Sequence, residues 1–494
     1  MARLPAPDRV RGVEDDASPH PQRGDRTMNA LKVLPCLALF GLAALAHADR
    51  LPNIVLLIGD DHGYPYFGFM GDDNVITPTM DALAAGGVTF SLGHSTAPYC
   101  RPSLRTLATG LHPIEYQIRL NDHIAALKEQ TDWQAMSAAE QRRWTTVNKA
   151  NGMRTFDTLP KLLGTKGYVS WQGGKWWENS YRNGHFDEGM TAGWDMSRFD
   201  TDTFFLELMG AEGNELVRET MDPLYDFIDR HGDAPMFIWF GPMLPHTPLD
   251  APYRFRKFYA DQNLSESAKL YYSNITWWDQ GVSDLMDRIE AKGLLEDTLF
   301  IYVSDNGYEQ DGDVEYATGS ETPSDELATG GFTGKGALYD LSVRTPIIFY
   351  WKGRLAASFN DSSLVSSLDI VPTVLDIAGI EVPASLRGQS LKPLLEGERD
   401  TLSERSELIG YSDNRRARGM TMGVRAEGYY VRTHRWHFFW YADTDEMRLY
   451  DVTVDPRGTK DLSAARPDLV SRFKDRIMAW KEDIGMPEAI DIYE

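Results

Sequence analysis

The feature that most constrains the fold is a series of short apolar runs separated by helical segments. Residues 53–59 form one continuous apolar run, and others follow at 236–240, 298–303 and 346–351. A further helix-then-strand unit spans 158–175. Apolar runs of this length are typical of strands buried on both faces, and their alternation with helices indicates a mostly parallel sheet. The chain is therefore predicted to have an α/β fold in which helices flank a central sheet.

The C-terminal part of the chain has a different character. Residues 429–441 are aromatic and rich in β-forming side chains, and 467–483 have the spacing of an amphipathic helix. Three earlier segments also have helical spacing: 78–87, 266–293 and 369–379. These patterns predict an α/β domain over 49–397 and a smaller α+β domain with an antiparallel sheet over 398–494.

The N-terminus has the pattern of an export signal. Residues 1–27 lack a periodic apolar pattern and are predicted to be disordered or untranslated. Residues 28–48 combine a positive start, an apolar run at 33–45 and a small-residue cleavage pattern (Ala-His-Ala). They predict a signal peptide, and hence a periplasmic or secreted protein without a membrane span after cleavage. Because Cys36 falls inside this signal, Cys100 is predicted to be the only cysteine of the mature chain.

Cys100 begins the sequence Cys-Arg-Pro-Ser-Leu-Arg-Thr-Leu-Ala-Thr-Gly. Pro102 and Ser103 have the pattern of a first helical turn, and Gly110 is a typical helix stop. The cysteine is therefore predicted at a helix N-terminus, where unpaired backbone N–H groups favour an anion. The alternative is a small buried hydrophobe, which is the usual role of an unpaired cysteine.

Polar side chains follow the ends of two predicted strands. Asp60 and Asp61 come directly after one strand, and Asp305 and Asn306 follow another. In parallel sheets the chemistry gathers at the carboxyl ends of the strands. Adjacent buried carboxylates repel each other unless a cation neutralises them, so these four side chains predict a Ca²⁺ site, with Mg²⁺ as the alternative. For either pair alone, a turn or a helix cap would be the better interpretation.

Taken in order along the chain, the motifs resemble those of the type I sulfatases, which belong to the alkaline phosphatase superfamily. The resemblance covers nearly all of residues 50–490. It rests on Asp-Asp-His-Gly at 60–63, the cysteine motif at 100–110, Gly-Lys-Trp at 174–176, Pro-His-Thr-Pro at 245–248, Ser-Asp-Asn-Gly at 304–307, Gly-Lys-Gly at 334–336, Asp369 with Pro372 and Thr373, Gly-Gln-Ser-Leu at 388–391 and Leu-Tyr-Asp at 449–451. It implies an alkaline-phosphatase-like α/β domain with a small C-terminal sheet.

The resemblance also implies a reaction and its residues. Cys100 would be oxidised by a maturation enzyme to formylglycine (3-oxoalanine), whose hydrate would join the metal site and attack the sulfur of a sulfate ester. Lys175 and Lys335 would hold the sulfate oxygens, and His246 would protonate the leaving alcohol. The covalent sulfate intermediate would then break by elimination. Arg101 is a further candidate, because it precedes the predicted helix and can reach this centre.

Two positions depart from the family pattern. Leu104 stands where the family motif has an arginine, and Arg105 lies about 100° around the helix from it, so Arg105 is no simple replacement. For Arg101 the alternative to a role in the site is a surface position. Trp177 stands where the family commonly places a histidine that acts as the base for elimination, and indole cannot accept a proton. The adjacent indole of Trp176, together with Trp177, would stack on a sugar or aryl ring or else pack in the core.

Three histidines are candidates to replace the missing base, and the sequence does not choose among them: His62, His123 and His185. The segment 309–334, rich in Gly, Asp, Glu and Thr, is predicted to be a long loop. Its role would be either that of a substrate-shaping lid or that of a surface loop.

The functions compatible with these motifs differ in substrate and in activity. The first is hydrolysis of a small sugar or aryl sulfate. The second is hydrolysis of a phosphate or phosphonate ester at a similar site. The third is a catalytically inactive sulfatase-like binding protein, which Leu104 and Trp177 favour and the retention of Cys100 disfavours. The net charge of −23 argues against nucleic acid as a partner, and favours a small or neutral sulfated substrate over a heavily sulfated polymer.

Overall fold

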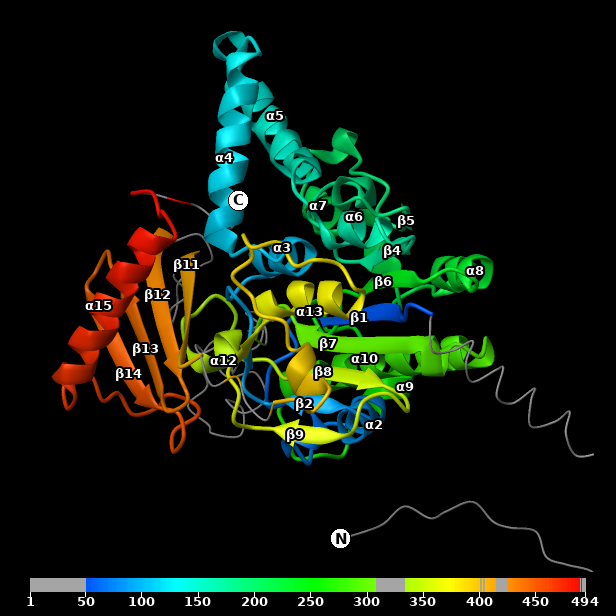
Figure 1. Cartoon of the computed structure of the whole chain (residues 1–494). Helices are drawn as coiled ribbons and strands as arrows, with labels where there is room; N and C mark the ends of the chain where they lie inside the picture. The colour runs from blue at the N-terminus through cyan, green and yellow to red at the C-terminus, as the bar shows by residue number, and fades with distance from the viewer. Residues whose placement is uncertain are drawn as a thin grey trace, which may run out of the picture. The chain divides into compact units, whose positions relative to one another are not determined.

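Eight strands form the central sheet of the computed structural model, which describes residues 50–307, 334–399, 402, 405–414, 425–488 and 490. Their order across the sheet is β5-β4-β6-β1-β7-β8-β2-β9 (Figure 1). Their bounds are β1 Asn53–Gly59, β2 Val88–Phe90, β4 Val169–Gly174, β5 Glu188–Gly189, β6 Met236–Gly241, β7 Thr298–Ser304, β8 Ile347–Trp351 and β9 Ser358–Asn360. Neighbours from β5 to β7 are parallel, whereas β8 runs antiparallel to both β7 and β2. The predicted mostly parallel sheet is confirmed.

Strand β1 shows that the sheet is buried on both faces. Successive strand side chains point to opposite faces, so Ile54, Leu56 and Ile58 enter one layer of the core and Val55 and Leu57 enter the other. The first layer includes side chains of α3 (Cys100–Thr109), α6 (Leu159–Gly164) and α13 (Ile370–Ile377). The second includes side chains of α2 (Pro78–Gly86), α8 (Asp222–His231) and α10 (Glu266–Ala291). This arrangement explains why the predicted strands read as continuous apolar runs.

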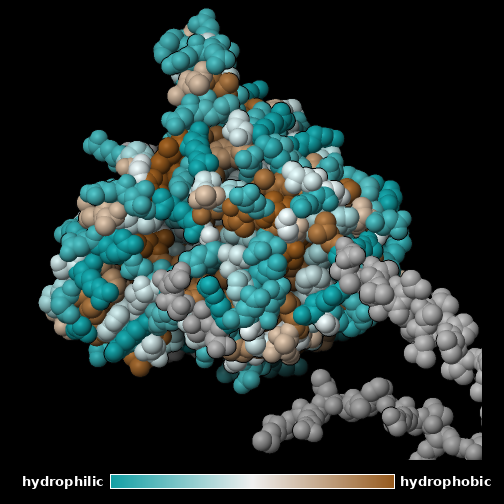
Figure 2. All heavy atoms as spheres, viewed as in Figure 1, coloured by the Kyte–Doolittle hydropathy of each residue, from teal (hydrophilic) through white to brown (hydrophobic). Residues whose placement is uncertain are grey.

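The helices predicted at 78–87, 266–293 and 369–379 are confirmed as α2, α10 and α13. The remaining elements of this part are β3 Gly93–His94, paired with β10 Val365–Ser366, and α4 Pro113–Glu129, α5 Ala138–Asn151, α7 Phe204–Met209, α9 Tyr253–Arg256, α12 Asp340–Val343 and α14 Lys392–Leu395. Helices α4 and α5 form a hairpin that is joined at its outer end, from which the two helices diverge, and this outer end is covered mostly by hydrophilic side chains (Figures 1 and 2). The sequence analysis did not identify this hairpin.

The C-terminal sheet is antiparallel, as predicted, and has four strands in chain order. They are β11 Glu407–Asn414, β12 Arg425–Thr433, β13 Trp436–Tyr441 and β14 Glu446–Asp451. Helix α15 (Pro467–Asp483) covers one face through Phe473 and Ile477, which pack in one cluster with Phe438. On the other face, Phe439 clusters with Leu338. The described residues from Leu51 onward belong to one compact unit, and the domain boundary after residue 397 stays a prediction.

Several predictions fall on residues that the structure does not describe. These are the extension 1–27, the signal peptide 28–48 with Cys36, and all of the predicted loop 309–334 except Gly334. Across the described ranges, none of the helices combines the length and the apolar character needed to cross a bilayer.

Candidate active site

Strands β1 and β7 bring the predicted metal ligands together. The two strands pair in parallel, and Gly59 lies opposite Ser304, so the residues that follow them are neighbours. The Asp61 backbone N–H donates to Asp305 Oδ1 over 3.0 Å, and Asn306 Nδ2 donates to Asp61 Oδ1 over 2.6 Å. Asp60, Asp61, Asp305 and Asn306 are all buried. The carboxyl edge of the sheet therefore holds the oxygen cluster that the sequence predicted.

Cys100 faces this oxygen cluster from the first position of α3. The helix runs to Thr109 and ends at Gly110, whose φ of 72° suits a left-handed cap, so the predicted helix is confirmed and begins at the cysteine. Cys100 Sγ lies 3.7 Å from Asp61 Oδ1, and the side chain is buried. Burial, together with the negative charge of Asp305, raises the pKa of the Cys100 thiol well above its ordinary value. An unmodified cysteine at this position would therefore stay protonated and be a weak nucleophile.

Lys175 reaches the cluster from the end of β4. Its Nζ donates to Asp60 Oδ1 over 2.6 Å and lies 3.1 Å from Cys100 Sγ. The preceding Gly174 has a φ of +91°, and a Cβ there would lie 1.8 Å from the carbonyl oxygen of Gly241. Only glycine permits this approach between the ends of β4 and β6, and that approach fixes where the lysine side chain begins.

Lys335 and His246 complete the cluster. Lys335 Nζ donates to Asp61 Oδ2 over 2.7 Å. The next residue, Gly336, donates its N–H to the Pro98 carbonyl, which fixes this segment against the chain that leads into Cys100. His246 Nε2 lies 3.5 Å from Asp61 Oδ2. Both residues predicted from the family resemblance therefore lie at the oxygen cluster.

The donor set fits a hard divalent cation. Three buried oxygens of the predicted ligands have no hydrogen-bond partner among the described residues: Asp60 Oδ2, Asp305 Oδ2 and Asn306 Oδ1. Asp60, Asp61, Cys100 and His246 also offer ligand atoms that lie within 4.8 Å of one another. Burying an unpartnered carboxylate oxygen is costly, and oxygen-rich sites of this kind suit Ca²⁺ or Mg²⁺.

The charge balance of the cluster agrees with this fit. Burial raises the pKa of Asp60 to about 7, although Lys175 and His246 act in the opposite direction. Burial and the charge of Asp61 raise the pKa of Asp305 as well. The basic side chains at the cluster therefore do not fully compensate the negative charge of these carboxylates.

Arg101 points to a different partner. Its Nε donates to Glu178 Oε1 over 3.0 Å and its Nη2 donates to Glu178 Oε2 over 3.2 Å. Arg105, one turn along α3, donates from Nε to the same Oε1 over 2.8 Å and is fully buried. The two arginines hold the loop after β4 against α3, and so fix Lys175 relative to Cys100. Sequence reasoning missed Glu178, since a single glutamate carries no pattern.

The two departures from the family pattern are both buried. Leu104 packs in the core beside α3, and Arg105 does not take the place of an arginine at 104 because its side chain is held on Glu178. The Trp177 ring centroid lies 5.9 Å from Lys175 Nζ, and the ring packs edge-on against Phe205.

Of the three histidines considered as replacement bases, His62 and His185 make side-chain contacts outside the oxygen cluster, and His123 lies on a separate helix. His62 stacks on Phe67, with ring centroids 3.9 Å apart, and burial lowers its pKa to about 3. His185 Nδ1 is within 3.0 Å of the Thr158 hydroxyl, and His123 belongs to α4. A replacement base is therefore not identified among them.

Comparisons with known proteins agree with this geometry. The sulfatase family model matches residues 52–380, and the model for the C-terminal region of N-sulphoglucosamine sulphohydrolase matches residues 329–483. The chain is 26% identical to arylsulfatase A of Homo sapiens, over 88% of this chain and 84% of that protein. It is 27% identical to N-acetylgalactosamine-6-sulfatase of Rattus norvegicus, over 74% of this chain and 70% of that protein.

Among solved structures, the phosphonate monoester hydrolase of Agrobacterium radiobacter has the same fold, with a TM-score of 0.61 and 17% identity over 88% of this chain and 96% of that one. The fold alone therefore does not separate sulfate from phosphonate chemistry. The sulfatase family model covers most of the chain, including every residue of the buried cluster. The chain belongs to the sulfatase family, as the order of its sequence motifs predicted, and it is a sulfuric ester hydrolase.

Proposed function

We propose that the protein hydrolyses the sulfate ester of a sugar or an aryl alcohol with a formylglycine formed from Cys100. The observation that carries this proposal is the position of the cysteine. Its Sγ lies 3.1 Å from Lys175 Nζ and 3.7 Å from Asp61 Oδ1, at the first residue of a helix. Formylglycine supplies an aldehyde whose hydrate provides a nucleophilic hydroxyl, which the buried thiol does not.

The oxygen cluster would hold the divalent cation. Asp60, Asp61, Asp305 and Asn306 offer the ligands, and three of them have a buried oxygen that accepts no hydrogen bond from the described residues. A bound Ca²⁺ or Mg²⁺ supplies positive charge that lowers the pKa of a hydroxyl and neutralises sulfate.

Two lysines of the cluster would bind the sulfate, and a histidine would protonate the leaving alcohol. Lys175 and Lys335 each contact a different carboxylate of the cluster, so their ammonium groups lie where they can bind sulfate oxygens and stabilise charge in the transition state. His246 Nδ1 lies 2.7 Å from the Thr247 carbonyl, to which it donates. This contact turns Nε2 toward the cluster, where it can deliver a proton to the leaving alcohol.

The first test is the mass of the peptide that carries Cys100, from protein purified from its native host. Trypsin cuts after Arg50 and Arg105, because Pro102 protects the bond after Arg101. We expect the mass of the aldehyde or its hydrate, and reaction of this peptide with a hydrazide probe. The same peptide from a Cys100→Ala variant is the control. An intact thiol, from a host that matures other sulfatases, would contradict the proposal and favour the inactive binding protein.

A second test separates a role of Lys335 in catalysis from a role in metal binding. Lys335→Ala is expected to reduce turnover of 4-nitrophenyl sulfate by about a hundredfold or more, because a charge-stabilising donor is lost, while Ca²⁺ binding measured by calorimetry persists. Unchanged turnover would remove Lys335 from the reaction. Parallel assays with 4-nitrophenyl phosphate and a phosphonate monoester test the rival chemistry, and faster turnover of either would favour it.

Export through the N-terminal segment is also part of the proposal. The support is the apolar run at 33–45 and the Ala-His-Ala pattern that follows it. N-terminal sequencing of protein recovered from the periplasm or medium is expected to start at Asp49. A mature chain that starts at Met1 or Met28 would contradict export by cleavage.

A further inference from the structure

A cavity of about 640 Å³ adjoins the reaction site and is bounded by α3, α5, α7 and the loop after β4. Pockets of about 300–1,000 Å³ bind ligands of drug size, so this space holds far more than one sulfate group. The described residues of the wall include Arg101, Arg142, Lys149, Trp177, Phe199 and Phe205. We call it the α5 groove.

Two residues of the α5 groove wall lie next to residues of the catalytic cluster. Arg101 follows Cys100 directly on α3, and Trp177 lies two residues after Lys175. Lys175 Nζ lies 3.1 Å from Cys100 Sγ and 5.9 Å from the Trp177 ring centroid. A substrate whose sulfate reaches Cys100 therefore has this groove as its immediate surroundings.

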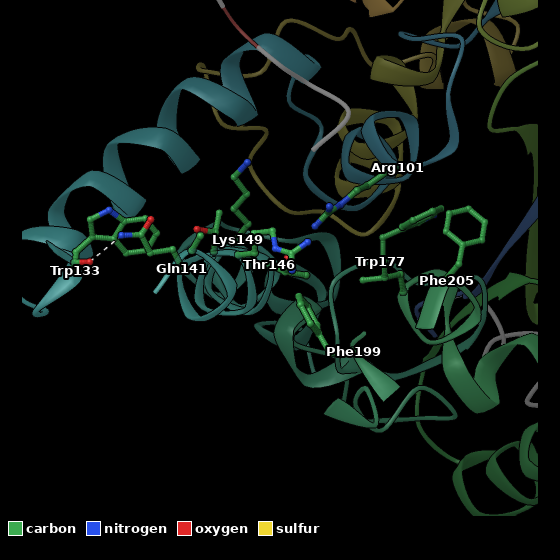
Figure 3. A pocket seen from close by; sticks show the side chains of 12 residues that line it. Arg101, Trp133, Gln141, Thr146, Lys149, Trp177, Phe199 and Phe205 are labelled. Carbon is green, nitrogen blue, oxygen red and sulfur yellow. Dashed lines mark hydrogen bonds between the residues drawn. The ribbon is translucent and has the colours of Figure 1, made fainter. Parts of the chain in front are cut away.

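Aromatic rings form part of the groove wall. Trp177 and Phe205 pack against each other, with ring centroids 5.8 Å apart, and Phe205 is 46% exposed (Figure 3). Trp177 Nε1 is buried without a hydrogen-bond partner among the described residues. A ring face next to an unsatisfied N–H donor suits a sugar, which offers both an apolar ring face and hydroxyl acceptors.

The charge of the groove is opposite to that of the whole chain. Its described wall includes three cations, Arg101, Arg142 and Lys149, and no carboxylate, although the chain carries a net charge of −23. Just outside this wall, Glu178 is shared by Arg101 and Arg105, and Asp200 is shared by Arg142 and Arg143, so the cations still outnumber the carboxylates. In Figure 3, Arg101 extends from α3 toward α5, where Lys149 lies. A local concentration of positive charge beside aromatic rings attracts anionic groups.

We propose that the α5 groove binds the sugar unit next to the sulfated one, and that this neighbouring unit carries a carboxylate or a second sulfate. The natural substrate is then an anionic sulfated oligosaccharide and not a simple aryl sulfate. The inference rests on the proposed function for the position of the scissile sulfate. It also explains the α4–α5 hairpin, because α5 supplies Arg142 and Lys149 to one side of the groove.

Calorimetry with the full chain carrying Cys100→Ala tests the groove without turnover. The probes are sulfated disaccharides with a uronic acid neighbour and their carboxyl-reduced forms, across several sulfate positions. We expect at least one acidic disaccharide to bind about tenfold or more tightly than its reduced form. Arg142→Ala with Lys149→Ala should remove this difference, and Phe199→Ala should weaken both probes. Lys161→Ala, in which a lysine paired with Asp157 is lost, is the matched control and should retain the difference.

The inference would be overturned by acidic disaccharides that bind no better than their reduced forms, and equally by a preference that survives the loss of both cations. Turnover of the same sulfated disaccharides by the wild-type protein, with Cys100 matured to formylglycine, is measured separately. Its absence would reject the proposed function, whereas the binding comparison alone decides the groove. Acidic monosaccharides without the sulfate serve as a third probe, and binding of these as tight as that of the disaccharides would also count against the inference.

Discussion

Two buried charge clusters in this protein both combine aspartates with basic side chains, and they differ in how much positive charge faces each carboxylate. At the carboxyl edge of the sheet, Asp60 and Asp305 each have one oxygen without a hydrogen-bond partner in the part of the chain that the structure describes. In the second cluster, Asp340 Oδ1 accepts from Arg432 Nε over 2.7 Å and lies 3.1 Å from His94 Nε2. Asp340 Oδ2 also has no hydrogen bond among the described residues, but Arg344 Nη1 forms an ion pair with it at 3.5 Å. The first cluster has too little positive charge and the second has ample.

The pKa values follow this difference. Burial raises the pKa of Asp60 to about 7. Asp340 is as deeply buried, yet Arg432, His94 and Arg344 hold the pKa of its carboxyl well below the ordinary value. Asp340 is the first residue of α12. It contacts His94 of β3 and Arg432 of β12, and so connects these two strands. We call the Asp340 cluster saturated, because its positive charge compensates the carboxylate, and such a cluster holds structural elements together. The cluster at the sheet edge is unsaturated, because it has too little positive charge, and it leaves room for a cation and a substrate anion.

The largest expected effect is on activity at the unsaturated cluster. Asp305→Asn is expected to lower turnover about a thousandfold, because it removes a ligand charge from the metal site. The free energy of unfolding of the metal-free protein should stay the same or rise, since one incompletely paired buried carboxylate is lost. Activity assays and urea unfolding in the presence of a chelator measure both effects. A large loss of metal-free stability would show that Asp305 is a structural residue instead.

The same type of substitution at the saturated cluster should affect stability and leave metal binding unchanged. Asp340→Asn is expected to lower the free energy of unfolding by about 3–5 kcal/mol, because it leaves the two arginines with uncompensated buried charge. Affinity for Ca²⁺ at low temperature should not change. Unfolding curves and calorimetry on the same sample test this pair of outcomes, and a stable Asp340→Asn protein would break the comparison.

Metal addition is the next largest effect. Ca²⁺ at a hundred times its dissociation constant should raise the free energy of unfolding by about 2.7 kcal/mol, since a ligand that binds only the folded state stabilises it. Asp340→Asn should keep this increment and Asp305→Asn should lose it. Thermal unfolding with Ca²⁺ and with a chelator distinguishes the two, and an equal increment in both variants would place the metal elsewhere.

The smallest effect is a pH dependence that arises at the saturated cluster. Burial lowers the pKa of His437 to about 4, despite Asp340 nearby, with Arg432 and His94 also facing it. The unfolded chain takes up this proton at about pH 6.5 and the folded chain only near pH 4. Stability is therefore full above pH 6.5 and falls as pH drops, by about 2 kcal/mol at pH 5. His437→Gln should flatten this slope, and an unchanged slope would assign it to other groups.

The fold was predictable wherever apolar periodicity was strong. Helix α10 and strand β1 bury most of their side chains or a full face, and both appear in the sequence at nearly their true bounds. Helix α5 was missed because Ala150 is its only buried residue, so it carries no apolar stripe. The available signal was its capping box, in which Ser137 accepts from the Glu140 N–H and the Glu140 carboxylate accepts from the Ser137 N–H.

The position of the reacting side chains was set by the sequence itself, because each follows a strand end or begins a helix, and strand ends of a parallel sheet meet at one edge. Asp60, Asp305 and Cys100 are examples. Tertiary structure alone decided which charges compensate these side chains and which residues surround them. Glu178 contacts two arginines that lie 73 and 77 residues away in the chain. The wall of the α5 groove carries positive charge, although the net charge of the chain is negative. Desolvation and Coulomb interactions depend on distance in space, and the order of residues does not specify these distances.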